Sequence, residues 1–256
     1  MIGDRELVFD ERFDDPAGFG KRWIPHYLPQ WSSRERTRAR WRLAHDGLHL
    51  LIEADQEPWA PEWDGGIRVS NLQTGVRSGP IGSRDGQHRF RPDLVVREAQ
   101  AERWAWTPQR GRIEIRAAAN ADPRTMVGLW LIGVERTPEE SGEICLLEIF
   151  GGEIHADRGM IGMGVHPFAD PALTDDFEKI EIEGDLTAMH DYAVEWTPEG
   201  LVFEVDGVVV KTSAQSPSYP MQLMLDVFEF EPDPEGRYPK EFVVERVRGW
   251  APVSSR

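Results

Sequence analysis

The segment Gly142-Glu143-Ile144-Cys145-Leu146-Leu147-Glu148-Ile149-Phe150 holds two glutamates, five residues apart, in an otherwise apolar run. A carboxylate in apolar surroundings is costly unless it is paired, hydrogen-bonded or exposed to a cleft. Two carboxyl groups about 5 to 5.5 Å apart can cleave a glycosidic bond with retention, one as nucleophile and one as general acid. Glu143 and Glu148 are the candidates for such a pair; edge-exposed glutamates on an ordinary strand are the alternative.

The backbone around the two glutamates decides whether they can act together. In a helix, at about 100° per residue, they would lie about 140° apart. In a regular strand Glu143 and Cys145 share one face, and Glu148 points to the other. One extra residue between Cys145 and Glu148, a β-bulge, would return Glu148 to the face of Glu143. The chemistry therefore predicts a bulged strand.

Short alternating or apolar runs recur between Gly, Pro, Asp and Asn residues, which is typical of an antiparallel sandwich. The predicted strands are Leu7–Phe9, Leu48–Ile52, Arg112–Arg116, Gly128–Val134, Glu143–Phe150, Lys179–Ile182, Tyr192–Trp196, Leu201–Val205, Val208–Lys211, Met221–Phe230 and Phe242–Trp250. Asp206-Gly207 predicts a two-residue hairpin turn, and Asp93–Ala101 is the best helix candidate. No linker or repeat divides the chain, so we expect one all-β domain over residues 1–256.

The segment Gly75–Gln100 carries few strand signals and many polar residues. It is predicted to be a long loop insertion, and such loops commonly shape binding sites over a rigid sheet.

The net charge of the 256 residues is −16, which argues against nucleic acid, a sulfated polysaccharide or an anionic membrane as the main partner. A neutral substrate fits better. The locally basic stretch Arg34–Arg42 is interpreted as a solvated face.

The single cysteine excludes an internal disulfide and a multi-cysteine metal site. No membrane span or secretory signal is visible, which predicts a cytoplasmic protein as the sequence stands and a secreted one if a leader has been removed. The oligomeric state is left open.

The chain holds ten tryptophans and eleven phenylalanines, most of which we expect in a two-sheet core. Sugar rings also stack on indoles through their apolar faces. The candidates for a saccharide groove are Trp59, Trp63, Trp104, Trp106 and Trp130.

Taken in order, several stretches resemble glycoside hydrolase family 16, whose members include β-1,3- and mixed-linkage glucanases with a concanavalin-like jelly roll. These stretches are Phe9–Phe13, Gly111–Ala117, Gly128–Leu131, Glu143–Glu148, His190–Pro198, Phe203–Gly207 and Val243–Val247. The resemblance implies two antiparallel sheets with a glycan groove on the concave sheet. It covers nearly the whole chain apart from Gly75–Gln100.

The resemblance also implies roles for individual residues. Glu143 would be the nucleophile and Glu148 the general acid/base, with Trp130 stacking on the sugar and His166 near the acid/base. Cys145 stands where the family pattern has aspartate. Because a thiol is neutral at ordinary pH and a weak donor, this replacement would alter the balance of pKa values in the pair. Cys145 as the nucleophile itself is a poor alternative, since the strand offers no adjacent base.

Further binding residues are predicted less directly. Trp63 is a candidate for sugar binding, and Asp226 and Glu229, in the run Met221–Phe230, are candidates for the same groove; a sheet edge or solvent face is the alternative for the two acids. No cofactor is expected for catalysis. The resemblance also implies a structural calcium, for which the nearest matches are Glu11, Gly47 and Glu245.

The sequence therefore predicts retaining endo-hydrolysis of a neutral β-glucan, β-1,3 or mixed-linkage. A carbohydrate-binding protein without turnover is one alternative, motivated by Cys145. A transglycosylase is another, because it would share the covalent intermediate.

Overall fold

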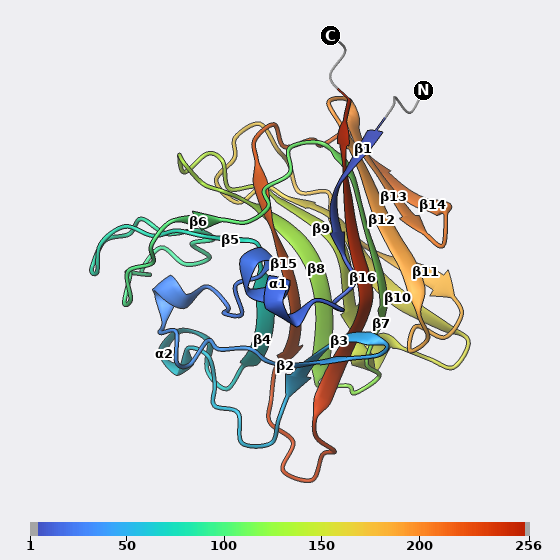
Figure 1. The fold of residues 1–256 in the computed structure, drawn as a ribbon, viewed down its shortest axis with the longest axis horizontal. Coiled ribbons are helices and arrows are strands. Elements are labelled where there is room, and N and C mark those ends of the chain that lie inside the picture. The colour runs from blue at the N-terminus through green and yellow to red at the C-terminus, as the bar shows by residue number, and fades with distance from the viewer. Residues whose placement is uncertain (1–4, 254–256) are drawn as a thin grey trace.

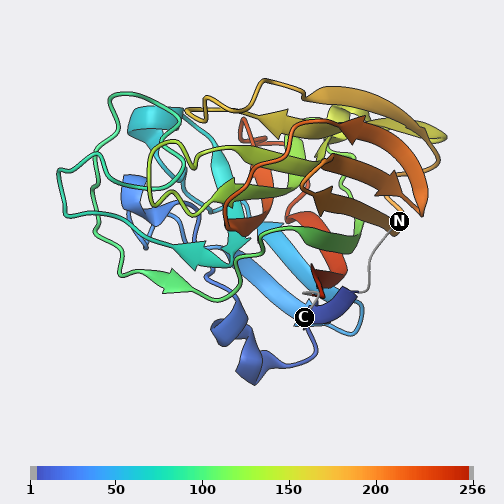
Figure 2. The ribbon, with the colours of Figure 1, turned by 90° about the horizontal axis from the view of Figure 1, so that it is seen from above.

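A computed structural model describes residues 5–253 and shows two antiparallel sheets packed face to face (Figures 1 and 2). The larger sheet has the order β14-β13-β12-β7-β16-β3-β2, with β1 paired to β16, and the smaller has the order β11-β10-β9-β8-β15-β4. The predicted all-β jelly-roll sandwich is confirmed.

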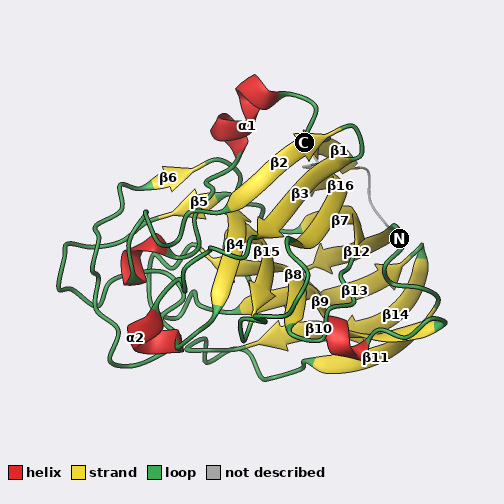
Figure 3. Ribbon diagram, turned by 90° about the horizontal axis from the view of Figure 1, so that it is seen from below, coloured by secondary structure: helices red, strands yellow, loops and turns green. Residues whose placement is uncertain are grey.

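The strands of the larger sheet are β1 (Arg5–Glu11), β2 (Arg40–Ala44), β3 (Gly47–Ile52), β7 (Gly111–Ala118), β12 (His190–Thr197), β13 (Gly200–Val205), β14 (Val208–Ser213) and β16 (Lys240–Pro252). Those of the smaller sheet are β4 (Arg68–Gln73), β8 (Thr125–Gly133), β9 (Glu143–Phe150), β10 (Arg158–His166), β11 (Glu178–Glu183) and β15 (Met221–Glu229). A two-stranded ribbon consists of β5 (Gly75–Val76) and β6 (Arg103–Trp104), and the helices are α1 (Pro16–Arg22), α2 (Pro61–Asp64), η1 (Pro29–Trp31) and η2 (Gly151–Glu153). Strands dominate Figure 3 and helices are few and short.

The main core lies between the two sheets and follows the alternation of the strands. In β7, Ile113 and Ile115 are buried in this core, while their neighbours are only partly buried. In β15 of the smaller sheet, Leu223, Leu225 and Val227 are buried in the same core. Side chains of period two thus give each sheet one face for the core.

The other face of the smaller sheet carries a second apolar cluster. Trp130 and Phe228 rise from the sheet, and Tyr27, Trp31 and Trp59 come from segments that cover part of this face. The central strands of this sheet are therefore buried on both faces near the cluster. What remains uncovered is the place where a groove can form.

The local turn signals of the sequence are confirmed. Asp206 and Gly207 both have positive φ, +50° and +75°, and they join β13 to β14 in a two-residue hairpin. The segment Gly75–Gln100 is irregular after β5, as expected of a loop insertion, and it projects from the left of the sandwich in Figure 1.

The predicted helix at Asp93–Ala101 is wrong. The segment is irregular, because Leu94 and Val96 are drawn into the second apolar cluster at a spacing of two residues. Helix α1 forms instead at Pro16, where the Asp15 side chain accepts a hydrogen bond from the Gly18 amide at 3.0 Å.

Strand β10 was not predicted because glycine is depleted in strands. Here the glycines permit close contacts. A Cβ on Gly162 would lie 2.4 Å from the Phe177 ring, and one on Gly164, with φ +141°, would lie 2.1 Å from the Asp176 carbonyl oxygen. Within residues 5–253, no helix combines the length and hydropathy needed to cross a membrane.

Candidate active site

Strand β9 contains the predicted bulge. Leu129 of β8 pairs with Leu147, while the next residue, Trp130, pairs with Cys145. Leu146 therefore has no counterpart, and the same shift appears on the other side of β9, against β10. Leu146 and Leu147 are both buried in the main core. The bulge thus places two consecutive side chains on one face of the strand.

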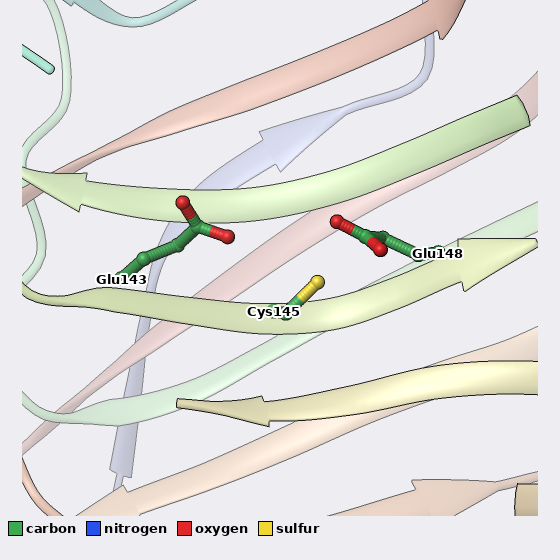
Figure 4. A group of neighbouring side chains, drawn as sticks. All are labelled: Glu143, Cys145 and Glu148. Atoms are coloured by element: carbon green, nitrogen blue, oxygen red, sulfur yellow. The ribbon is translucent and has the colours of Figure 1, made fainter. Parts of the chain in front are cut away.

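The bulge returns Glu148 to the face that carries Glu143 and Cys145 (Figure 4). One oxygen of each glutamate and Cys145 Sγ lie within 4.8 Å of one another. All three side chains point away from the main core. This arrangement suits a reaction in which two carboxyl groups act on one bond from the same side of a sheet.

The two glutamates open into a cavity of about 550 Å³ that we call the groove. Its other lining residues are Tyr27, His88, Met126, Trp130, His166, Pro167, Phe168, Asp175 and Phe228. The lining is mostly aromatic or apolar, with a few polar groups. Such a wall can stack on sugar rings while the two carboxyl groups face the bond.

Glycines flank Glu148 on both sides. Gly128 is its cross-strand partner in β8, and Gly162 is its partner in β10. A Cβ on Gly162 would come within 3.3 Å of the Glu148 Cβ. Because neither neighbour has a side chain, space is left on both sides of Glu148 for its carboxyl group and a bound sugar. Any residue other than glycine at these two positions would fill part of this space.

Burial raises the pKa of the Glu143 carboxyl well above its usual range, and the neighbouring Glu148 and Asp226 add to this effect. Burial also raises the pKa of Glu148, but the Cys145 thiol and the charges of His166 and Lys179 partly offset it. Two carboxyl groups this close cannot both ionise cheaply, so the pair tends to retain a proton. One ionised and one protonated carboxyl is the state that retaining glycoside cleavage requires.

Asp226 lies in the same row of the sheet as Glu148, with Gly128 between them. Its Oδ2 accepts a hydrogen bond of 2.7 Å from Trp130 Nε1, and its Oδ1 has no partner among the described residues. A Cβ on Gly128 would lie 2.7 Å from that oxygen. Asp226 is fully buried and does not line the groove, so its direct contact is with the indole that does.

The structure also brings Trp130 and His166 to the groove, as predicted. His166 is the cross-strand partner of Glu143. Its ring stacks on Phe177 with centroids 4.7 Å apart, and its Nδ1 lies 3.5 Å from an Asp175 oxygen. His166 is thus held beside the two carboxyl groups by packing on one side and by an acid on the other.

The predictions for Glu229 and Trp63 are not supported. β15 is regular, so Glu229, three residues from Asp226, points to the opposite face; it is buried against Arg68 at 3.2 Å and the Tyr238 hydroxyl at 2.7 Å. Trp63 is absent from the groove lining, and the guanidinium groups of Arg91 and Arg97 lie over its ring.

Of the five tryptophan candidates, only Trp130 is among the described residues that line the groove. Trp59 is buried and donates to Asp64, and Trp106 stacks on Phe9 at 4.3 Å. The Trp104 ring packs close to Gly75 in the β5–β6 ribbon. These indoles have structural contacts that account for them.

The residues expected to hold calcium do not form an oxygen cage as they stand. Glu11 accepts hydrogen bonds from the Phe13 amide at 2.7 Å, from Arg22 Nε at 2.6 Å and from Trp23 Nε1 at 3.1 Å. Glu245 lies 3.1 Å from the Arg116 guanidinium. Arginine and N–H donors already use these oxygens, and calcium needs them free. The calcium site stays a prediction for which this donor set gives no support.

Several groove residues escaped the sequence analysis. Phe228 could have been found, because it is two residues from Asp226 on a regular strand. Tyr27, His88 and Phe168 come from loops, and their positions depend on how those loops cross the sheet. His88 belongs to the Gly75–Gln100 insertion, so that loop does contribute to the groove.

Comparison with known proteins gives a family match over part of the chain and a shared fold over nearly all of it. Residues 107–231 match the model described as glycosyl hydrolases family 16. No curated protein matches the chain in sequence. In structure, the chain is similar to an endo-β-galactosidase from Clostridium perfringens that releases GlcNAcα1-4Gal, with 28% identity and a TM-score of 0.85. The match covers 97% of this chain and 62% of that one, so the chain spans less than two thirds of that protein's length.

Two further structures share the fold. A laminarinase from Flavobacterium sp. UMI-01 is 18% identical with a TM-score of 0.66, and the match covers 96% of this chain and all of that one. The Crh5 transglycosylase is 13% identical with a TM-score of 0.59, covering 94% of this chain and 82% of that one. The matched family segment contains the whole of β9, with Cys145 in place of the expected aspartate. The chain is therefore similar to glycoside hydrolase family 16 over residues 107–231, and nearly all of it shares the two-sheet fold of these structures.

Proposed function

We propose that the protein is a retaining endo-β-glycosidase with Glu143 as nucleophile and Glu148 as general acid/base. The observation that carries this proposal is the bulge, which puts both carboxyl groups on one face, with oxygens within 4.8 Å of each other and of Cys145 Sγ. On a regular strand the pair would be divided between the core and the groove.

The reaction proceeds in two displacements. A Glu143 oxygen attacks the anomeric carbon as the bond to the glycosidic oxygen breaks, and Glu148 gives its proton to that departing oxygen. Glu148, now ionised, then takes a proton from water while the water oxygen attacks the same carbon and releases Glu143. The sugar therefore leaves with the configuration it had.

The difference in exposure between the two carboxyl groups supports this division of roles. The acid/base must exchange protons with the leaving oxygen and with water, and Glu148 is the more exposed of the two. Glu143 is deeply buried, which favours its neutral form in the free protein. The positive charge that develops on the sugar ring at the transition state favours its ionised form instead.

The glycan backbone has two candidates. A β-glucan follows from the resemblance of the sequence to β-glucanases, and a β-galactoside is favoured by the 28% identity with an endo-β-galactosidase. We expect product release from one member of a panel of β-1,3-glucan, mixed-linkage glucan and β-galactosidic oligosaccharides. Proton NMR of the first product formed should show the β-anomer before mutarotation.

An α-anomeric first product would refute the retaining mechanism. Binding without product for every glycan would favour the carbohydrate-binding protein instead. A transglycosylase would use the same intermediate with a sugar hydroxyl in place of water, and products longer than the substrate would identify it.

Cys145 provides a test of how the pair is tuned. Burial raises the pKa of its thiol well above the usual range, so it is neutral between the two glutamates. We expect Cys145→Asp to move both limbs of the pH profile of kcat/KM toward higher pH, because a third carboxylate opposes ionisation of the other two. In Cys145→Asn the new side chain has nearly the shape of aspartate but no charge, so this variant should keep the wild-type pH profile of kcat/KM. An unchanged profile for the aspartate variant would show that position 145 does not tune the pair.

A further inference from the structure

A second cavity, of about 540 Å³, adjoins the groove. The two share His88 and Phe168 as lining residues. Most of its other lining residues come from the Gly75–Gln100 insertion and from the loop between β8 and β9. The charged ones are Arg77, Arg84, Asp85, Arg89, Glu135 and Arg136. We call this space the arginine cavity. A saccharide that extends from the two carboxyl groups past His88 and Phe168 would enter it.

Positive charge is in excess in the arginine cavity. Arg84, Arg89 and Arg136 are exposed, and no carboxylate of the described chain lies within ion-pair distance of them. Arg77 is the exception, because it pairs with Asp85 at 2.5 Å and donates to the Glu135 carbonyl oxygen. Three guanidinium groups are therefore free to meet a ligand.

The other titratable groups do not cancel this charge. Burial raises the pKa of Glu135 to about 7, so its carboxyl is only partly ionised at neutral pH. Burial and the nearby His166 lower the pKa of His88 to about 4, which leaves its imidazole neutral. The positive potential of the cavity thus comes from the arginines, in a chain whose net charge is −16.

A neutral glycan offers no charge that could pair with three guanidinium groups. Arginine presents a planar fork of donors that binds a sulfate or a carboxylate in a bidentate manner. We propose that the arginine cavity is a subsite for an anionic substituent, a sulfate ester or a sugar carboxylate, on a sugar unit a short distance along the chain from the bond that is cleaved. The proposal rests on the proposed function for its reaction, and it replaces the expectation of a wholly neutral substrate.

The test compares backbone-matched oligosaccharides that are neutral, sulfated or carboxylated. We expect wild type to cleave at least one anionic form with kcat/KM about tenfold or more above the neutral form, with the advantage falling as salt is added. The triple variant Arg84→Ala/Arg89→Ala/Arg136→Ala should lose this advantage through a higher KM and should cleave the neutral form as wild type does. A gain with only one of the two anions identifies the substituent.

The matched control removes three other exposed arginines, Arg34, Arg36 and Arg38, for which the structure likewise shows no ion pair. None of them lines the groove or the arginine cavity. The control should keep the preference for the anionic substrate. An equal loss in both triple variants would overturn the proposal, because it would show an effect of total charge rather than of a site.

The failure of the subsite is distinguishable from the failure of the catalytic proposal. Equal cleavage of neutral and anionic forms by wild type overturns the subsite and leaves the endo-glycosidase in place. If wild type cleaves none of these oligosaccharides, their binding is measured by isothermal titration calorimetry. Tighter binding of an anionic form by wild type that is lost in the triple variant supports the subsite without catalysis. Equal binding of the neutral and anionic forms overturns the subsite.

Discussion

Glu143→Gln and Glu148→Gln are each expected to lower kcat on a polymeric β-glycan by a factor of about 10²–10⁴ or more. The first removes the proposed nucleophile, so no glycosyl–enzyme bond should form. The second removes the proton that the leaving oxygen needs. Both side chains keep their size, and neither glutamate makes an ion pair among the described residues, so we expect the fold to persist. The measurement is product release under substrate saturation.

Azide can separate the two roles. With an aryl glycoside, whose leaving group needs little protonation, Glu148→Ala should still form the intermediate, and azide should then give the β-glycosyl azide. Glu143→Gly leaves space for azide to attack in place of the carboxylate, which should give the α-glycosyl azide.

The matched control is Glu181→Gln, on the exposed face of β11, two strands from β9. Its kcat should equal that of wild type. Activity within tenfold of wild type in both glutamine variants would show that the catalytic residues are elsewhere. An α-azide from the Glu148 variant would reverse the assigned roles.

Asp226→Asn is expected to stabilise the protein at pH 8 and to change its stability little near pH 4. Burial raises the pKa of Asp226 well above its usual range, the charge of Glu148 adds to this, and the Trp130 N–H only partly compensates. In the unfolded chain an aspartate titrates near pH 3.9. Below that pH the carboxyl is protonated in both states, so asparagine replaces a neutral group with a neutral group.

As the pH rises from about 4, the unfolded state releases this proton and the folded state retains it, so wild type loses stability until the folded pKa is passed. The asparagine variant does not have this loss. We expect Tm at pH 8 to exceed that of wild type by at least about 2–4 °C, the change that 1 kcal/mol produces in a chain of this size. Melting curves from pH 4 to pH 8 test this.

Asp10→Asn is a control of opposite sign. Its hydrogen bonds to Arg246 hold the pKa of Asp10 below the usual range. Its contribution to stability is therefore present above pH 4 and lost as the pH falls, so this variant should be less stable than wild type at pH 8. If Asp226→Asn is less stable than wild type at pH 8, the fold does not raise the pKa of Asp226, and the prediction is wrong.

The part of the site within one strand could be predicted from the sequence. The faces of a strand alternate with a period of two residues, so Glu143 and Glu148 could share a face only if one extra residue lay between them, and Leu146 is that residue. The same rule, applied to Asp226 and Glu229, would have separated them, and the structure does separate them. The alternation of β7 and the Asp206-Gly207 turn were predictable for the same local reason.

Predictions failed where a residue type fits two environments. Trp63 could stack on a sugar or pack in a cluster, and its cover by Arg91 and Arg97 depends on the course of a loop. β10 was missed because its glycines suggest a loop, while their contacts with Phe177 and Asp176 come from a neighbouring segment. The sequence around Asp93 has no strong local preference for a helix, and the burial of Leu94 and Val96 determines the conformation of this segment.

By itself, the sequence determined the two-sheet architecture, the pair of glutamates proposed to be catalytic and the bulge that the pair requires, because each depends on patterns within a few residues. Only the tertiary structure decided the surroundings of that pair. Asp226 meets Glu148 across Gly128 from another strand, and Arg84, Arg89 and Arg136 meet in one cavity from two loops. Side-chain alternation is local, whereas burial, pKa and potential depend on which distant segments the fold brings together.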